Sequence, residues 1–203
     1  MVDDAHPLPD EDGEIRHVDF GGQALDGVRY EDVTFVRCDL SEVTTSGVVF
    51  SGCTFVDCRF NASTHTSTAF TGCTFRGGNF FDTTFTGCKL VGSTFLRCEY
   101  GLVTIAGGDW SFVTLAGADL RKAQITGVRM READLTGAQL QEAVLQGVDL
   151  SGAALARVDL TGADLRGSDV GTLDPLSAQL SRAVIDPAQA VVLAEAMGLV
   201  VVG

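Results

Sequence analysis

The sequence has no run of about 18 apolar residues, the length that a membrane-spanning helix requires. It contains one Trp and three His, and it shows no Ser/His/Asp set, no phosphate-binding glycine loop and no metal-ligand spacing. These absences argue against an enzyme, a cofactor and a bound metal. The first 14 residues lack an apolar segment and carry six acidic residues and no basic one, so we expect no secretory signal and a cytoplasmic protein.

The charge is strongly unbalanced toward acid. The 203 residues include 27 acidic and 14 basic side chains, which gives a net charge of −13. Residues 1–14 alone contribute −6, and we expect them to form a disordered acidic tail. An acidic protein is a poor ligand for nucleic acid, so the composition favours a basic protein partner instead.

What the sequence has in abundance is a period of five residues. Residues 131–170 divide into the blocks READL, TGAQL, QEAVL, QGVDL, SGAAL, ARVDL, TGADL and RGSDV. A period of five fits neither a helix nor an ordinary strand, and it indicates a solenoid whose units stack on one another. The large residue that ends each block, the central residue, falls on multiples of five from Phe20 to Ile185, with lapses at Thr45, His65 and Pro175. No insertion shifts this frame, so we expect no long loop.

The other positions of the block are specialised too. All six Cys lie two residues before a central residue, where Ala, Val and Ser also occur, so we interpret them as buried thiols rather than as disulfides or metal ligands. Gly recurs two residues after the central residue, which is typical of a corner with positive φ. Four blocks would then close a coil of 20 residues. Phe dominates the central positions before Tyr100 and Leu those after it, so we expect the core packing to change there.

The blocks ADLTG (133–137), VDLSG (148–152), VDLTG (158–162) and ADLRG (163–167) resemble the A(D/N)LxG-like consensus of the pentapeptide-repeat family. The resemblance implies an all-β solenoid, a right-handed quadrilateral β-helix of pentapeptide repeats, over residues 15–185. After it, Asp186-Pro187-Ala188-Gln189 predicts the start of a helix. We expect residues 186–203 to form a short C-terminal helix and a β-prone tail that cap the solenoid.

This C-terminal segment is so apolar that we expect it to be covered on both sides. One side would lie on the last coil, and the other would meet a second copy in a two-fold dimer joined end to end. The predicted dimer contacts are Leu180, Ile185, Val191, Val192, Leu193, Met197, Leu199 and Val201.

Acidic residues gather near the same end, with eight acids and two bases in residues 132–174. The unbroken frame and the C-terminal segment resemble the Qnr/MfpA branch of the family, fluoroquinolone-resistance proteins that imitate B-DNA and bind DNA gyrase. The resemblance implies a non-enzymatic homodimer that binds gyrase, with topoisomerase IV as a further candidate, and protects it from fluoroquinolones or other topoisomerase poisons. It implies no membrane or direct nucleic-acid contact. The predicted partner-binding acids are Glu99, Asp109, Asp119, Glu132, Asp134, Asp149, Asp159, Asp164 and Asp169.

Three alternatives remain open at this stage. The solenoid could be a non-enzymatic scaffold for a different protein, and such a role would not depend on the acids. The ladder of Thr residues from Thr34 to Thr114 permits an ice-binding face, although stacked coils produce such ladders without any function. Thr45 and His65 lie one coil apart and could mark a pocket, but we favour a locally irregular face with His65 hydrogen-bonded or turned outward.

Overall fold

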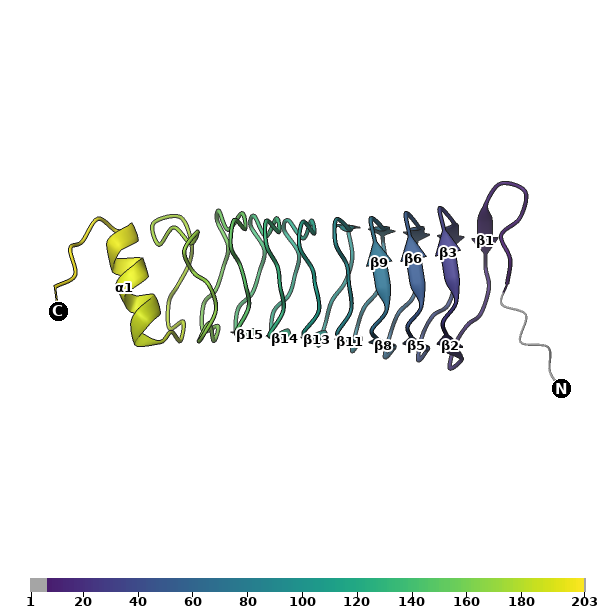
Figure 1. Cartoon of the computed structure of the whole chain (residues 1–203), viewed down its shortest axis with the longest axis horizontal. Coiled ribbons are helices and arrows are strands. Elements are labelled where there is room, and N and C mark those ends of the chain that lie inside the picture. The colour runs from purple at the N-terminus through teal and green to yellow at the C-terminus, as the bar shows by residue number, and fades with distance from the viewer. Residues whose placement is uncertain (1–6, 203) are drawn as a thin grey trace.

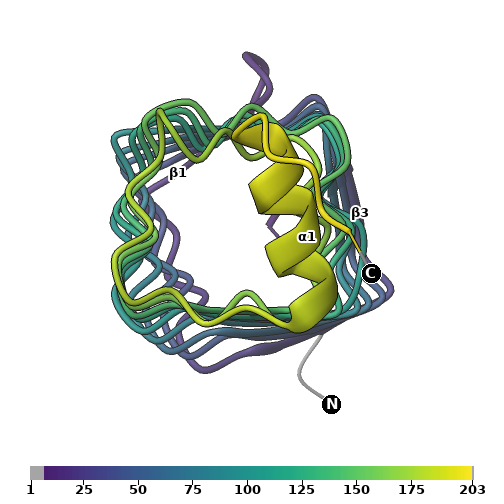
Figure 2. The same ribbon diagram turned by 90° about the vertical axis from the view of Figure 1, so that its left-hand side faces the viewer.

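The structure is a computed structural model that describes residues 7–202. The chain winds into a rod of roughly square cross-section (Figures 1 and 2). The described residues form fifteen three-residue strands, all paired in parallel, and one helix. Each paired strand lies 20 residues from its neighbour, as in Glu14↔Thr34 and Thr34↔Thr54. The predicted four-sided solenoid with a 20-residue coil is therefore confirmed.

The four faces are numbered in chain order, by the central residues that begin with Ile15, Phe20, Leu25 and Tyr30. The first face contains β1 (Glu14–Arg16), β4 (Thr34–Val36), β7 (Thr54–Val56), β10 (Thr74–Arg76) and β12 (Thr94–Leu96). The third contains β2 (Ala24–Asp26), β5 (Thr44–Ser46), β8 (Thr64–Thr66), β11 (Thr84–Thr86), β13 (Thr104–Ala106), β14 (Gln124–Thr126) and β15 (Val144–Gln146). The fourth contains β3 (Arg29–Glu31), β6 (Val49–Ser51) and β9 (Ala69–Thr71). The second face is joined by isolated bridges such as Asp19↔Asp39.

The five-residue block explains both the sides and the corners. In each strand the middle residue is buried and its two neighbours face outward, because successive side chains of a strand alternate. Two residues after the central residue the backbone turns with a left-handed φ. Gly22 (φ 68°) and Gly27 (φ 63°) do so, but so do non-glycine residues such as His17 (φ 55°). The corner therefore needs the conformation that Gly favours, without requiring Gly at every coil.

The core of the first half is a set of stacked rings. The ring centroids of Phe35 and Phe55 lie 4.8 Å apart, and Phe75 and Phe95 continue the column at 4.7 Å. The aromatic stack ends at Tyr100 and Trp110, and a narrow apolar gap there is lined by these rings and by residues such as Leu115 and Leu120. The predicted change of packing near Tyr100 agrees with this break. Beyond it, the strands of the described chain lie on the third face alone.

The cysteines are free, and five of the six are fully buried, as interpreted, whereas Cys98 is partly exposed. They also have a polar role that their sequence position did not reveal. The Cys58 thiol donates to the carbonyl of Phe35 (3.4 Å), and the Ser93 hydroxyl takes the same role toward Phe70 (2.5 Å). The position two residues before the central residue thus supplies a hydrogen-bond donor to a backbone carbonyl of the preceding coil.

The expected irregular face at Thr45 and His65 is absent, because both residues stand in regular register in β5 and β8. His65 is hydrogen-bonded, as expected, but inside the core: its Nδ1 lies 2.8 Å from Thr45 Oγ1 and its Nε2 lies 3.0 Å from Ser63 Oγ. Ser63 donates its own proton to the Phe60 carbonyl, so it accepts from Nε2–H, and Thr45 then donates to Nδ1. A neutral imidazole protonated on Nε2 satisfies both ring nitrogens, and Thr68 then donates to Thr45 Oγ1 (2.7 Å).

The N-terminal end differs from the expected disordered tail over residues 10–14. The Asp10 carboxylate accepts hydrogen bonds from the backbone N–H groups of Asp12 and Glu14 (3.0 and 2.9 Å), and Asp10 N–H donates to the Glu14 carbonyl (2.9 Å). This turn closes onto β1, which begins at Glu14. Residues 1–6 of the predicted tail lie outside the described residues.

The helix α1 (Pro187–Ala196) lies across the end of the last coil (Figure 2). Asp186 caps it in a reciprocal capping box with Gln189, and Gly198 (φ 82°) follows its C-terminus, as the sequence predicts. Residues 199–202, expected to be β-prone, form no strand, because an extended segment needs a neighbouring strand to bond its backbone. No described helix is long and apolar enough to cross a membrane.

Candidate partner-binding surface

The nine predicted acids lie on the outside of the rod and are distributed over all four of its faces. The second face carries Glu99, Asp119 and Asp159, the fourth Asp109, Asp149 and Asp169, the first Asp134 and the third Asp164, while Glu132 stands at the corner between the fourth and first faces. They therefore do not form one patch.

Four of the nine acids stand at one corner of the rod or on the two faces that meet there. Glu132, Asp134, Asp149 and Asp169 flank the corner between the fourth and first faces, and we call them the acidic edge. Asp134 and Asp169 each use Oδ1 to accept a backbone N–H two residues later, at 3.0 and 2.8 Å. Among the described residues only Asp149 of this group has an ion-pair partner, Arg131. The edge therefore keeps most of its negative charge uncompensated.

Several of the other acids are compensated by arginines. Asp119 pairs with Arg121 and Asp164 with Arg166, each at 2.6 Å. The hydrogen bond from Arg166 holds the pKa of Asp164 well below its usual range, and Arg121 lowers the pKa of Asp119 in the same way. These carboxylates stay ionised at any physiological pH, but their field is partly cancelled by the neighbouring guanidinium.

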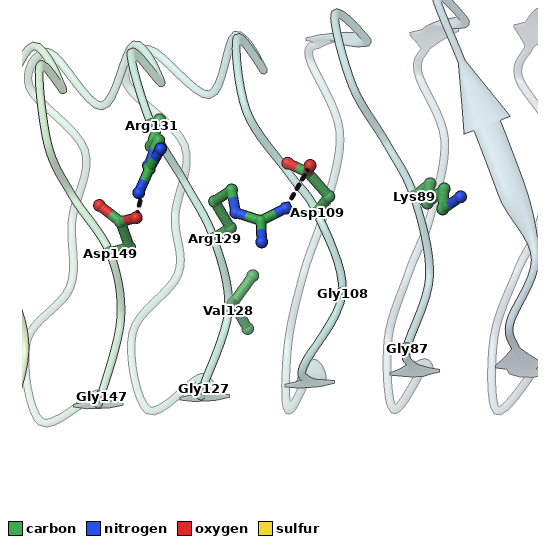
Figure 3. A pocket seen from close by; sticks show the side chains of 10 residues that line it. All are labelled: Gly87, Lys89, Gly108, Asp109, Gly127, Val128, Arg129, Arg131, Gly147 and Asp149. Atoms are coloured by element: carbon green, nitrogen blue, oxygen red, sulfur yellow. Dashed lines mark hydrogen bonds and ion pairs between the residues drawn. The ribbon is translucent and has the colours of Figure 1, made fainter.

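A groove of mixed charge lies on the fourth face (Figure 3) and was not predicted. Its volume is about 640 Å³, and its floor includes the side-chain-free corners Gly87, Gly127 and Gly147. Arg129 pairs with Asp109 at 2.8 Å and Arg131 with Asp149 at 2.6 Å, while Lys89 has no ion partner among the described residues. The groove is visible in sequence only by comparing every twentieth residue, since positions 89, 109, 129 and 149 are Lys, Asp, Arg and Asp.

The predicted dimer contacts divide into two groups. Leu193 is buried in the cap, and Leu180 and Ile185 pack partly against the core. The others, Val191, Val192, Met197, Leu199 and Val201, are exposed. The prediction missed further exposed apolar residues at this end, namely Leu176, Val184, Val200 and Val202. One side of α1 therefore closes the coil while the opposite side presents apolar surface to solvent.

The described residues contain no group of three His, Cys, Asp or Glu side chains that could hold a metal ion. The features that distinguish this surface are thus charge and apolar exposure. An all-parallel β-solenoid built from five-residue units, closed by one terminal helix, defines the class of protein.

Comparison with protein families assigns the chain within that class. A family model described as pentapeptide repeats matches residues 103–137 and 133–170, and one described as a pentapeptide repeat region matches residues 28–105. Together they span most of the solenoid, so the chain belongs to the pentapeptide-repeat family.

Solved structures with the same fold include two trypsin-treated variants of QnrB1, described as a plasmid-mediated fluoroquinolone resistance protein. The first matches with a TM-score of 0.65 and 24% identity, covering 93% of this chain and 100% of the trypsin-treated chain. The second matches with a TM-score of 0.63 and 21% identity, covering 92% and 99%. At these identities the similarity shows a shared fold. A search of curated protein sequences found no match.

Proposed function

We propose that this protein is a non-enzymatic, dimeric mimic of duplex DNA that binds DNA gyrase and protects it from fluoroquinolones or other topoisomerase poisons. The acidic edge is the observation that carries this proposal. The shared fold with QnrB1, a fluoroquinolone resistance protein, supports it. Topoisomerase IV, which handles the same nucleic acid, is a further candidate partner, and the function places the protein in the cytoplasm.

The acidic edge resembles a phosphate backbone in presenting carboxylates on successive coils, of which only Asp149 has an ion-pair partner among the described residues. Asp149 and Asp169 occupy the same column one coil apart, and coils repeat at about 4.8 Å along the rod. Glu132 and Asp134 extend the charge around the corner onto the first face. A basic groove that accepts a duplex would be attracted to such a rod before contact, because uncompensated charges steer association.

The apolar end supplies the second element of the proposal. Val191, Val192, Met197, Leu199 and Val201 are exposed on and beside α1. Exposed apolar surface of this kind is commonly covered by another protein, and a two-fold contact lets one patch cover its own copy. A dimer joined here would carry two acidic edges on one longer rod. Its mode of action would be competition with DNA for gyrase, which requires no catalytic residue.

The mixed-charge groove favours a second candidate, a scaffold for a different protein. Lys89, Arg129 and Arg131 do not imitate phosphates, so a partner that used this groove would not be one that binds DNA. In that case the acidic edge would be a solvated surface. The two candidates differ in which charges matter for binding.

The test is a direct binding titration with purified gyrase at about 50 and 300 mM salt. Variant Asp134→Lys/Asp169→Lys reverses two charges of the acidic edge. Variant Glu42→Lys/Asp82→Lys changes the net charge equally, at two exposed corners of the N-terminal half. We expect the first variant to lose at least about tenfold in affinity and the second less than about threefold, with wild-type binding weakened by salt. Equal binding by both variants, or binding that salt does not change, would contradict mimicry by charge.

A further inference from the structure

Exposed large apolar side chains gather around one coil of the solenoid. Leu102 and Phe112 lie at two corners, and Leu96 ends β12 on the first face, next to the corner residue Arg97; they are 54%, 53% and 38% exposed. Phe81, 49% exposed, is next to Asp82, the corner residue one coil before Leu102. Between residues 15 and 170 these four are the exposed large hydrophobic residues of the described chain. We call them the apolar girdle.

At two of these positions the backbone conformation disfavours any side chain. Leu102 and Phe112 have left-handed φ values of 62° and 61°. Sixteen non-glycine residues share this conformation, and the other fourteen are polar or charged apart from Ala62. A side chain costs about 1–2 kcal/mol at such φ values relative to Gly. Because about half of each side chain is exposed, burial within the chain offsets this cost only in part. A violation of local preference is expected at functional sites.

Phe81 packs against Gly101 of the next coil, where the absence of a side chain leaves room for its ring. A Cβ atom on Gly101 would lie 2.9 Å from Phe81 Cδ2, so the ring rests directly on the backbone of the next coil. Beside it, the second face has a hollow of about 400 Å³ lined by residues that include the acids Glu99 and Asp119 and the bases Arg121 and Lys122. Glu99 accepts a hydrogen bond from Asn79 (2.8 Å) and has no ion-pair partner among the described residues.

We propose that the apolar girdle anchors the protein in a concave protein surface, the duplex-binding saddle of gyrase, with the first and second faces turned toward it. This inference rests on the proposed function. A flat partner touches one face of a square rod and its two corners, whereas Phe112 and Leu102 lie at opposite ends of the first and second faces, with Leu96 on the first face between them. The partner must therefore wrap around two faces, as a saddle made for a duplex does.

The chemistry of the girdle restricts the partner further. Large apolar side chains have no complement on a phosphate backbone, so the occupant is a protein with apolar sockets for Leu102 and Phe112. A second copy is not the proposed occupant, because the proposed dimer contacts begin at Leu180, several coils farther along the rod, and would leave the girdle free.

The girdle and the acidic edge make different contributions to binding. The edge steers association and its effect is screened by salt, whereas burial of Leu102 and Phe112 is an apolar contact that salt does not screen. Loss of the girdle should thus weaken binding equally at low and high salt.

The test uses Leu102→Gly and Phe112→Gly, singly and together. Gly prefers the backbone conformation at these corners, so the variants should melt at the wild-type temperature or above it. Ala62→Gly is the matched control, since Ala62 is neutral, shares the corner of Leu102 and has a φ of 55°. We expect the double variant to lose at least about tenfold in gyrase affinity at both salt concentrations, while Ala62→Gly binds like wild type.

Two results would refute the proposed role of the apolar girdle in binding while leaving the proposed function intact. One is wild-type gyrase affinity in the double variant. The other is a melting temperature clearly below wild type, which would show that Leu102 and Phe112 serve the fold. Failure of the wild-type protein itself to bind gyrase would refute the proposed function, and with it the assignment of gyrase to the girdle.

Discussion

His65 is a polar residue in a column of rings, stacked on Phe85 at 5.0 Å and edge-on to Phe70 at 5.3 Å. Burial lowers the pKa of its imidazole to about 3, from an ordinary value of 6.5. The neutral ring is therefore favoured in the folded state. The stabilisation that results from keeping His65 neutral is complete above pH 6.5 and decreases as the pH falls toward 3. It decreases because His65 binds a proton in the unfolded chain but not in the folded chain over this range.

We predict that the wild-type protein loses about 2–3 kcal/mol of unfolding free energy between about pH 7 and pH 4.5 through this residue. His65→Phe continues the ring column and removes the titrating group, so its stability should fall less over the same range. Denaturant titrations of the two proteins at both pH values measure the difference, since all other groups titrate alike in both. Parallel loss in the two proteins would contradict the buried neutral imidazole.

Gly107 and Gly108 are adjacent, yet they should respond differently to substitution. A Cβ on Gly108 would lie 2.1 Å from the Cys88 carbonyl oxygen and 2.8 Å from its nitrogen, whereas a Cβ on Gly107 meets no atom within 4 Å. Gly107→Ala should cost about 1 kcal/mol, through its left-handed φ of 63° alone. Gly108→Ala must also separate two hydrogen-bonded coils and should cost about 3 kcal/mol or more. Thermal melts that rank the two variants in the opposite order would refute this packing.

At the scale of elements, one set of α1 residues caps the last coil and a different set is exposed for the proposed dimer contact. Gln189 is buried and donates through Nε2 to the carbonyls of Leu165 (2.6 Å) and Ser168 (2.7 Å), while Leu193 covers the last coil. Met197 and Val201 point to solvent, 54% and 44% exposed. The cap and the proposed dimer contact can therefore be altered separately.

We predict that Met197→Lys/Val201→Lys yields a folded monomer, because it places charge in the dimer contact and leaves the cap intact. Gln189→Leu should instead destabilise the fold by about 1–3 kcal/mol, because two buried carbonyls lose their donor, and should leave the protein dimeric. Sedimentation and thermal melting distinguish the two effects. A wild-type monomer at high concentration would contradict the dimer.

The elements that follow local rules were predictable, and those that depend on other coils were not. The five-residue frame defined the coil, and the Asp186-Pro187-Ala188-Gln189 start defined α1, because both depend on neighbouring residues. The His65 network was only partly foreseen, since its partners Thr45 and Ser63 come from two coils and two block positions. The turn at residues 10–14 depends on one carboxylate, Asp10, whose role no periodicity indicates.

On the surface of the whole molecule, too, features that depend on several coils could not be predicted from neighbouring residues. Counting acids along the sequence suggested an acidic zone, but the structure distributes those acids over four faces and compensates several with arginines. Whether Arg131 reaches Asp149 depends on the direction of a long side chain, which sequence spacing does not specify. The apolar girdle was invisible until the corners were known, because Leu102 and Phe112 differ from the other exposed residues at left-handed φ only in being large and apolar.

The most direct test of the proposed DNA mimicry is a gyrase supercoiling assay titrated with the protein, with and without a fluoroquinolone. We predict that wild-type protein inhibits supercoiling at about micromolar dimer and reduces drug-induced cleavage, because it occupies the site of the duplex. The Asp134→Lys/Asp169→Lys variant should do both less well. Full supercoiling and unchanged cleavage at saturating folded protein would contradict the DNA mimic and leave a pentapeptide-repeat rod whose partner is a different protein.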